Sequence, residues 1–288
     1  MSDLKGIDSH FAFGENWASY AALIARLQIE EAKKGLLRLV PAQDLAGKSF
    51  LDIGCGSGLH SLAALELGAQ LVLAIDLDPN SVATARSVLS KNAARSNWTV
   101  QTRSVFDLDP AEGAFDVVYS WGVLHHTGDM WEAVRKASAM VAPGGLLVIA
   151  LYRRTSLDRL WSIEKRFYAS APEPIQRLLR CCYVAAFRAA LMLAGRNFRN
   201  YVANYKSSRG MDFHHDVHDW LGGYPYEAAL AGEVESALTA LGFKPERVNA
   251  RPKSVGLFGS GCDEYVYRAS LSAPVAQMQA RSVEFGTR

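Results

Sequence analysis

The chain has 288 residues, of which 49% are hydrophobic and 21% charged, and its formal net charge is +2. These values are ordinary for a globular protein with a large core, and they favour one domain with an elaboration. The near-neutral charge gives no electrostatic case for general nucleic-acid binding.

The four cysteines, Cys55, Cys181, Cys182 and Cys262, form no CxxC pair and show no metal-ligand spacing. This pattern favours a reduced, cytoplasmic chain. The first six residues lack an apolar signal region, and no run reaches the roughly 18 apolar residues of a spanning helix. We therefore expect no transmembrane segment.

Strands and helices alternate along the chain. The hydrophobic pattern predicts a strand that ends near Ile53, with Pro143-Gly144-Gly145 as a turn before the fifth strand. The alternation argues for a parallel sheet covered on both faces. The predicted helices are 59–67, 79–95 and 130–140, and the predicted strands after the first are 71–75, 98–103, 115–120, 146–151, 243–250 and 264–269.

The segment Phe50-Leu51-Asp52-Ile53-Gly54-Cys55-Gly56-Ser57-Gly58 is a buried strand followed by a glycine turn. Glycines there let a backbone approach a bound nucleotide, although nicotinamide and flavin folds use a related turn. Two acidic residues narrow the choice of bound nucleotide. Asp52 would repel a pyrophosphate but favour a cationic amino-acid tail, and Asp76 ends the next apolar run, where an acid binds both hydroxyls of a ribose.

Five motifs, over roughly residues 45 to 150, carry a resemblance to the class I S-adenosylmethionine-dependent methyltransferases, and to the ubiquinone-biosynthesis branch in particular. The resemblance implies a Rossmann-like methyltransferase fold: a doubly wound, seven-stranded, mostly parallel α/β sheet with a helical insertion between strands 5 and 6. It implies S-adenosyl-L-methionine as cofactor and S-adenosyl-L-homocysteine as product. The motifs are Leu51–Gly58, Ala74–Asp78, Phe115–Ser120, Leu124–His126 and Val141–Gly145.

Segment lengths suggest a division of the chain around this core. About 80 residues separate the fifth and sixth strands, too many for a plain loop. We expect a lid and helix over 1–45, the methyltransferase core over 46–151 and 233–271, a helical substrate cap over 152–232, and a flexible tail over 272–288.

The resemblance also assigns cofactor contacts. The glycines would hold the methionine part, Asp52 would lie near its amine, and Asp76 would bind the ribose. Ser104 stands where the family often has an acid for the adenine. Trp17 lies in a segment that closes over the cofactor in some relatives, or else leads into a helix. The full set is Trp17, Asp52, Gly54, Gly56, Gly58, Asp76, Leu77, Ser104, Val105, Phe106, Ser120 and Trp121.

Two histidine clusters are candidates for a general base. His125 and His126 follow the fourth strand, and His214 and His215 lie in a second cluster over 209–227. In that second cluster we expect substrate contacts from Asp212, Trp220, Tyr224 and Tyr226. A surface loop and a metal site at His214, His218 and Asp216 are the alternatives; we predict no metal.

Methyl transfer to a small-molecule acceptor, with oxygen as the favoured atom, is the predicted function. A homo-oligomer is left open. An enzyme for tRNA or protein is the runner-up, supported by cap arginines on one side of a helix: Arg177, Arg180, Arg188, Arg196 and Arg199. A lipid methyltransferase with an amphipathic helix over 176–199 is a third reading, and a non-catalytic cofactor-binding module is the least favoured.

Overall fold

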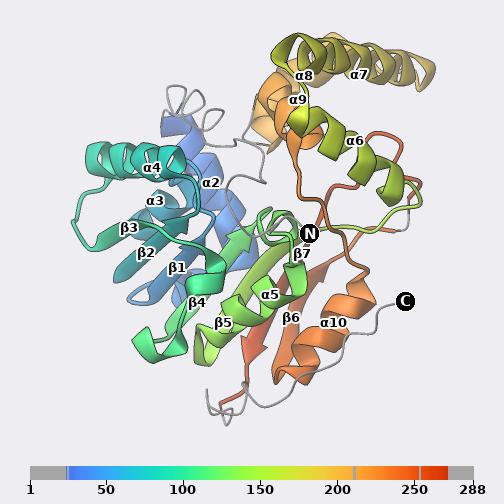
Figure 1. Cartoon of the computed structure of the whole chain (residues 1–288). Coiled ribbons are helices and arrows are strands. Elements are labelled where there is room, and N and C mark those ends of the chain that lie inside the picture. Colours follow the sequence, from blue (N-terminus) through green and yellow to red (C-terminus); the bar gives the residue numbers. More distant parts are fainter. Residues whose placement is uncertain (1–23, 25, 210–211, 253, 272–288) are drawn as a thin grey trace.

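A computed structural model describes residues 24, 26–209, 212–252 and 254–271. The predictions for Trp17, for most of the N-terminal lid and for the tail lie outside these residues. One seven-stranded sheet has the order β3-β2-β1-β4-β5-β7-β6 (Figure 1). The strands are β1 (Ser49–Ile53), β2 (Leu71–Asp76), β3 (Trp98–Thr102), β4 (Phe115–Trp121), β5 (Val141–Tyr152), β6 (Phe243–Asn249) and β7 (Cys262–Ala269).

Only β7 runs antiparallel to its neighbours β5 and β6; the other pairs are parallel. Helices cover both faces of this sheet, which confirms the predicted fold class. Helices α2 (Arg26–Leu39), α3 (Leu59–Glu66) and α4 (Pro79–Asn92) cover one face, and α5 (Met130–Ala139) and α10 (Ala231–Ala240) cover the other.

Burial of both sheet faces explains why β1 is apolar without alternation. Phe50 packs with α2 and α3, while its neighbour Leu51 packs on the opposite face with α5 and α10. Both side chains are 0% exposed. A strand that is covered on both faces needs apolar side chains at consecutive positions.

The fifth strand corrects one prediction. Pro143-Gly144-Gly145 is not a turn before the strand, because β5 already begins at Val141. The register with β4 jumps from Phe115↔Val141 to Val117↔Leu146, so the three residues form a bulge within β5. A Cβ on Gly145 would lie 2.8 Å from the carbonyl oxygen of Asp116, and glycine permits this close contact.

Five helices lie between β5 and β6, and the four that precede α10 make up the helical insertion that the sequence predicts. These four are α6 (Asp158–Ser170), α7 (Glu173–Leu193), α8 (Phe198–Arg209) and α9 (Phe213–Gly222). Their buried side chains form a separate small core around Tyr168, Tyr205, Phe213, Val217 and Leu221. Figure 1 shows them beyond the carboxyl ends of the parallel strands, where they face the glycine turn after β1.

The prediction of one helix over 176–199 is wrong. Helix α7 ends at Leu193 and α8 begins at Phe198, with Gly195 between them in the left-handed region at φ 68°. Among the described residues no single helix is long and apolar enough to cross a membrane; α7 and α8 pass that test only as a pair bent by 114°. The arginines consequently do not share one helix side, and Arg180 donates inward to Tyr168 Oη at 2.8 Å.

The buried position of Phe50 gives a test of the fold. We predict that Phe50→Ala lowers the free energy of unfolding by about 3–5 kcal/mol, because truncation leaves a cavity between sheet and helices. Leu71, at the start of β2, is 47% exposed, so Leu71→Ala should cost much less. Urea denaturation followed by circular dichroism measures both values, and equal losses would contradict the packing described.

Candidate active site

The turn after β1 has glycine at three positions where the backbone conformation disfavours any other residue. Gly54, Gly56 and Gly58 have φ angles of 72°, 52° and 75°, in the left-handed region. A Cβ on Gly54 would lie 2.4 Å from Val123 Cγ1, and one on Gly58 would lie 2.9 Å from Ala85 Cβ. The bare backbone of this loop therefore lines the cavity described below.

Asp76, at the end of β2, is bonded to the glycine loop. Its Oδ2 accepts the Gly56 N–H at 2.9 Å, and its Oδ1 accepts the Asp78 N–H at 3.0 Å. Burial raises the pKa of this carboxyl to about 6. Both oxygens keep a lone pair for a further donor, so the carboxylate is able to accept two hydroxyl groups at the cavity wall.

Asp52 occupies a different position from the one expected. It is 3% exposed, and its Oδ2 accepts a hydrogen bond from the Ser61 hydroxyl at 2.6 Å. Burial raises its pKa to about 7. Asp52 is not among the residues that line the cavity. It lies behind the glycine loop and joins β1 to α3.

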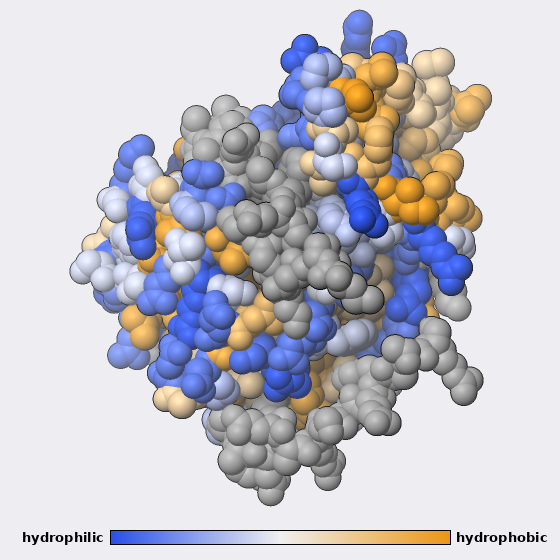
Figure 2. Space-filling model, in the orientation of Figure 1, coloured by the Kyte–Doolittle hydropathy of each residue, from blue (hydrophilic) through white to orange (hydrophobic). Residues whose placement is uncertain are grey.

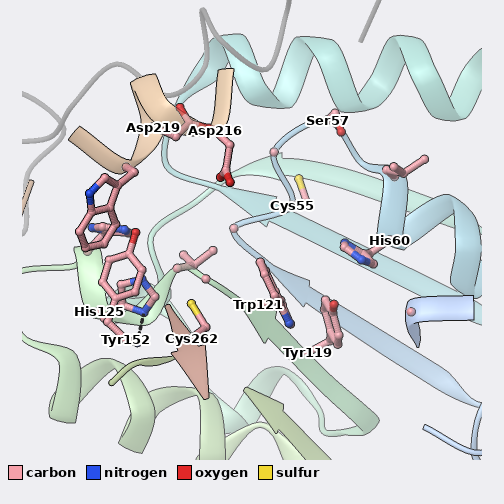
Figure 3. Close-up of a pocket in the computed structure, with 18 of the residues that line it drawn as sticks. Cys55, Ser57, His60, Tyr119, Trp121, His125, Tyr152, Asp216, Asp219 and Cys262 are labelled. Carbon is pink, nitrogen blue, oxygen red and sulfur yellow. Dashed lines mark hydrogen bonds between the residues drawn. The ribbon is translucent and has the colours of Figure 1, made fainter. Parts of the chain in front are cut away.

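One large cavity, of about 1420 Å³, runs from the glycine loop to the helices between β5 and β6. Single-ligand pockets are commonly ~300–1,000 Å³, so this cavity has room for two ligands. Figure 3 shows Cys55 and Ser57 on the loop side and Asp216 and Asp219 across from them. The aromatic side chains that line the far part are Tyr152, Tyr183, Phe187, Tyr201, Tyr205, Phe213, Trp220 and Phe258.

Leu77, predicted to bind the cofactor, and Ser104, Val105 and Phe106, predicted to lie on the adenine side, all line this cavity. The Ser104 hydroxyl accepts the Phe106 N–H at 3.2 Å and thereby caps a short 3₁₀ turn. That turn holds Val105 and Phe106 at the end of β3. Of the residues that the structure describes, none places a carboxylate at the Ser104 position of the wall.

Trp121 and Ser120, at the end of β4, have different roles: one lines the cavity and the other does not. Trp121 lines the cavity, and its Nε1 donates to Glu264 Oε1 at 3.1 Å. Arg38 also bonds Glu264, at 2.5 Å, which ties α2 to β7. Ser120 is 0% exposed and donates to the Ile53 carbonyl at 3.0 Å, so it joins β4 to β1 instead of facing the cavity.

His125 lines the cavity as a neutral hydrogen-bond donor. Its Nδ1 accepts the Tyr152 N–H at 3.2 Å, and its ring stacks on Tyr152 at 3.8 Å between centroids (Figure 3). The proton of the neutral ring is therefore on Nε2, which has no hydrogen-bond partner among the residues that the structure describes. Burial lowers the pKa of His125 well below its usual value, so the ring stays uncharged.

His126 has the opposite tautomer. Its Nδ1 lies 2.7 Å from the Pro225 carbonyl oxygen, which is only an acceptor, so Nδ1 carries the proton. The basic lone pair is then on Nε2. A Cβ on Gly223 would lie 2.6 Å from His126 Cε1, so glycine makes space for the ring. His126 is 7% exposed and lines the same cavity as the glycine loop.

The second histidine pair is not brought to the cavity. Asp212 caps α9 by accepting the N–H groups of His214 and His215, at 2.9 and 3.2 Å. His215 Nδ1 lies 3.1 Å from the same carboxylate, and the His214 side chain is exposed. None of these three residues lines the cavity. They stabilise the start of α9.

One face of α9 does line the cavity, through Phe213, Asp216, Val217, Asp219 and Trp220. Asp216 accepts a short hydrogen bond from the Tyr205 hydroxyl. Sequence reasoning missed Asp216 and Asp219 as cavity residues, and also Tyr152. The usable signal was the capping residue Asp212, because it sets the helix start and positions 216, 219 and 220 then share a face.

The two predicted tyrosines lie behind the wall. Tyr226 is 8% exposed, donates to Asp158 Oδ1 at 3.0 Å and packs 5.4 Å from the Tyr152 ring. Neither Tyr226 nor the half-buried Tyr224 lines the cavity, whereas Trp220 does. Tyr226 therefore supports Tyr152 from outside the cavity.

The alternative metal site receives no support. His218 Nδ1 accepts from the Tyr168 hydroxyl at 2.7 Å and lies 3.1 Å from Arg180. Burial, with this arginine close by, lowers the pKa of His218 to about 4. Within the described part of the chain, no three His, Cys, Asp or Glu side chains gather as metal ligands would.

Comparison with known proteins identifies the family. A family model described as a methyltransferase domain matches residues 24–201 of the 288. The match covers more than half of the chain, so the chain belongs to this family. It is a class I S-adenosylmethionine-dependent methyltransferase, and S-adenosylmethionine is the cofactor of that class. The glycine cradle and the Asp76 carboxylate fit that cofactor.

Two curated relatives resemble part of the chain. A ubiquinone biosynthesis O-methyltransferase of Xanthomonas oryzae pv. oryzae is 40% identical over 113 residues, or 39% of this chain and 46% of the relative. A tRNA U34 carboxymethyltransferase of Hahella chejuensis is 37% identical over 105 residues, or 36% of this chain and 32% of the relative. The chain thus spans less than half the length of these relatives.

A solved structure shows the same fold. The magnesium protoporphyrin IX methyltransferase of Synechocystis PCC 6803, with bound SAH, aligns with a TM-score of 0.50 at 15% identity. The alignment covers 85% of this chain and 84% of that chain. At this identity the likeness concerns the fold alone.

Asp76 gives the test of the cofactor site. We predict that Asp76→Ala weakens S-adenosylmethionine binding at least about tenfold, because two charge-assisted hydrogen bonds are lost. Wild-type affinity should decrease as the pH is lowered below about 6, where this carboxyl takes up a proton, loses its charge and turns one of its two acceptor oxygens into a donor. Calorimetry measures both effects.

Asp107→Ala is the matched control, since Asp107 follows β3 but does not line the cavity. It should bind like wild type. Unchanged binding by a folded Asp76→Ala protein would contradict the ribose assignment.

Proposed function

We propose that the enzyme transfers a methyl group from S-adenosylmethionine to a hydroxyl oxygen of a small molecule. The observation that carries the proposal is the His126 tautomer. The Pro225 carbonyl holds the proton on Nδ1, so a basic Nε2 belongs to a ring that lines the cofactor cavity. A hydroxyl acceptor needs such a base, whereas a thiolate needs little help.

In this proposal different residues of the chain hold different parts of the cofactor. The backbone of Gly54 and Gly56 cradles the amino-acid part, and Asp76 accepts from the ribose hydroxyls. Val105 and Phe106 cover the adenine. The cofactor supplies a methyl group already activated on a sulfonium and leaves as S-adenosylhomocysteine. The protein's task is then to align the acceptor and exclude water.

The two histidines divide the acceptor chemistry. His126 Nε2 removes the hydroxyl proton as the oxygen is methylated. His125 offers only the Nε2–H, because its Nδ1 already accepts the Tyr152 N–H. It therefore donates a hydrogen bond that orients the acceptor oxygen. His214 and His215, which lie away from the cavity, take no part.

The segment 152–232 acts as the substrate cap. Its contribution to the cavity is mainly aromatic, through Tyr183, Phe187, Tyr201 and Trp220. Such walls favour a flat or largely apolar acceptor of small size. The Xanthomonas relative is an O-methyltransferase, which supports oxygen as the methylated atom. None of the four cysteines forms a disulfide, which fits a cytoplasmic enzyme.

An acceptor screen with base variants tests the proposal. Simple phenols and catechols are offered with S-adenosylmethionine, and formation of S-adenosylhomocysteine is measured. We predict that His126→Gln lowers kcat by about 10²–10⁴-fold on the best hydroxyl acceptor.

His214→Gln is the matched control, because this exposed side chain lies outside the cavity, and its rates should equal those of wild type. Full activity of His126→Gln, or methylation of amines or thiols but of no hydroxyl, would overturn oxygen methylation with His126 as base.

A further inference from the structure

The outer side of α6 and α7 is an exposed apolar surface. Fifteen large hydrophobic side chains of the described residues are exposed, and seven belong to these two helices. On α6 they are spaced three and four residues apart, as one helix face requires. They are Leu160 (59% exposed), Ile163 (68%), Phe167 (54%), Ile175 (39%), Leu178 (62%), Met192 (66%) and Leu193 (91%).

The opposite faces of the same helices are turned inward. On α6, Trp161 and Tyr168 pack into the small core of the inserted helices, and on α7 Tyr183 and Phe187 do so. We call the exposed side, made of the seven apolar residues above, the α6–α7 outer face. Figure 2 shows hydrophobic residues gathered over these helices at the upper right. The packing of the described residues therefore leaves this face uncovered.

The charges around the outer face have one sign. Between residues 158 and 200 six arginines are exposed: Arg159, Arg166, Arg177, Arg188, Arg196 and Arg199. Glu173 is the single exposed acid in that range, and it pairs with Arg177 and Arg180. The surface thus combines apolar side chains with a nearly unopposed positive fringe, although the whole chain has a net charge of only +2.

We propose that the α6–α7 outer face docks on an anionic lipid bilayer. Apolar side chains of a surface helix enter the boundary between headgroups and acyl chains, and arginines bind the lipid phosphates. A second copy of this chain fits less well, because a symmetric contact would bring like charges together. A nucleic acid would pair its phosphates with the arginines, but the apolar side chains of Phe167, Leu178 and Leu193 would then lie against the charged phosphate backbone.

Docking would bring the acceptor cavity close to the membrane surface. Tyr183 and Phe187 line the cavity from the inner side of α7, the same helix that carries Leu178 and Met192 outward. The docking proposal does not depend on which atom is methylated, and it is tested without any acceptor.

Vesicle sedimentation of the full chain is the test. Vesicles of phosphatidylcholine alone are compared with vesicles that also contain phosphatidylglycerol. We expect binding to the anionic vesicles that weakens as salt is raised. The double variant Phe167→Glu/Leu178→Glu should weaken binding to the anionic vesicles at least about tenfold. The double variant Arg188→Gln/Arg199→Gln should weaken it about 25-fold, because each arginine contributes about a factor of five.

Leu71→Glu is the matched control, because Leu71 is 47% exposed on β2, at the opposite end from the inserted helices. It should bind vesicles like wild type. Cofactor affinity, measured by calorimetry, should be unchanged in all these variants, which separates lost docking from lost folding or a failed methyltransferase site.

Three results would overturn the proposal. The first is no binding to anionic vesicles by folded wild type. The second is binding that the two outer-face double variants leave unchanged. The third is that the double variants instead abolish self-association in analytical ultracentrifugation, or binding to total RNA, while vesicle binding persists.

Discussion

The site depends on one pair of hydrogen bonds, those that Asp76 accepts from the backbone of Gly56 and Asp78. They fix the glycine loop of β1 against the end of β2, and so set the distance between the loop backbone and the carboxylate. Burial works against this arrangement, since it raises the pKa of Asp76 to about 6 and that of Asp52 to about 7. For both groups the pKa in the folded state exceeds the ordinary value, so ionisation at neutral pH costs folding free energy. The loop amides offset part of that cost.

A buried lysine joins two of the inserted helices, α6 and α9. Lys165 is 0% exposed, donates to the Trp220 carbonyl and lies 3.5 Å from the centroid of the Trp220 ring. Burial lowers its pKa to about 7. Trp220 in turn packs 5.3 Å from Tyr152, on which His125 stacks. A substitution at Lys165 would therefore alter the packing of the cavity wall, although Lys165 itself does not line the cavity.

The same helices have two different surfaces. Their inner side is aromatic and closes the cavity, and their outer side is apolar with an arginine fringe. If both proposals hold, one insertion serves acceptor recognition with its inner side and membrane attachment with its outer side, while the core sheet keeps the cofactor geometry.

The sequence by itself determined the sheet, the glycine loop and Asp76, because these depend on local signals: continuous apolar strands, positive-φ glycines and acids at strand ends. It also identified His125 and His126 by their place after β4. It did not reveal their tautomers, which depend on Tyr152 and Pro225, nor that Ser61 draws Asp52 away from the cavity. The predictions for site residues in the insertion, His214 and His215 above all, agreed least with the structure. Whether a histidine on α9 lines the cavity depends on how that helix is rotated about its axis, which we call its phase. Only the tertiary structure decided that phase, because the packing of α9 on α6 brings Asp216, Asp219 and Trp220 inward and leaves His214 exposed.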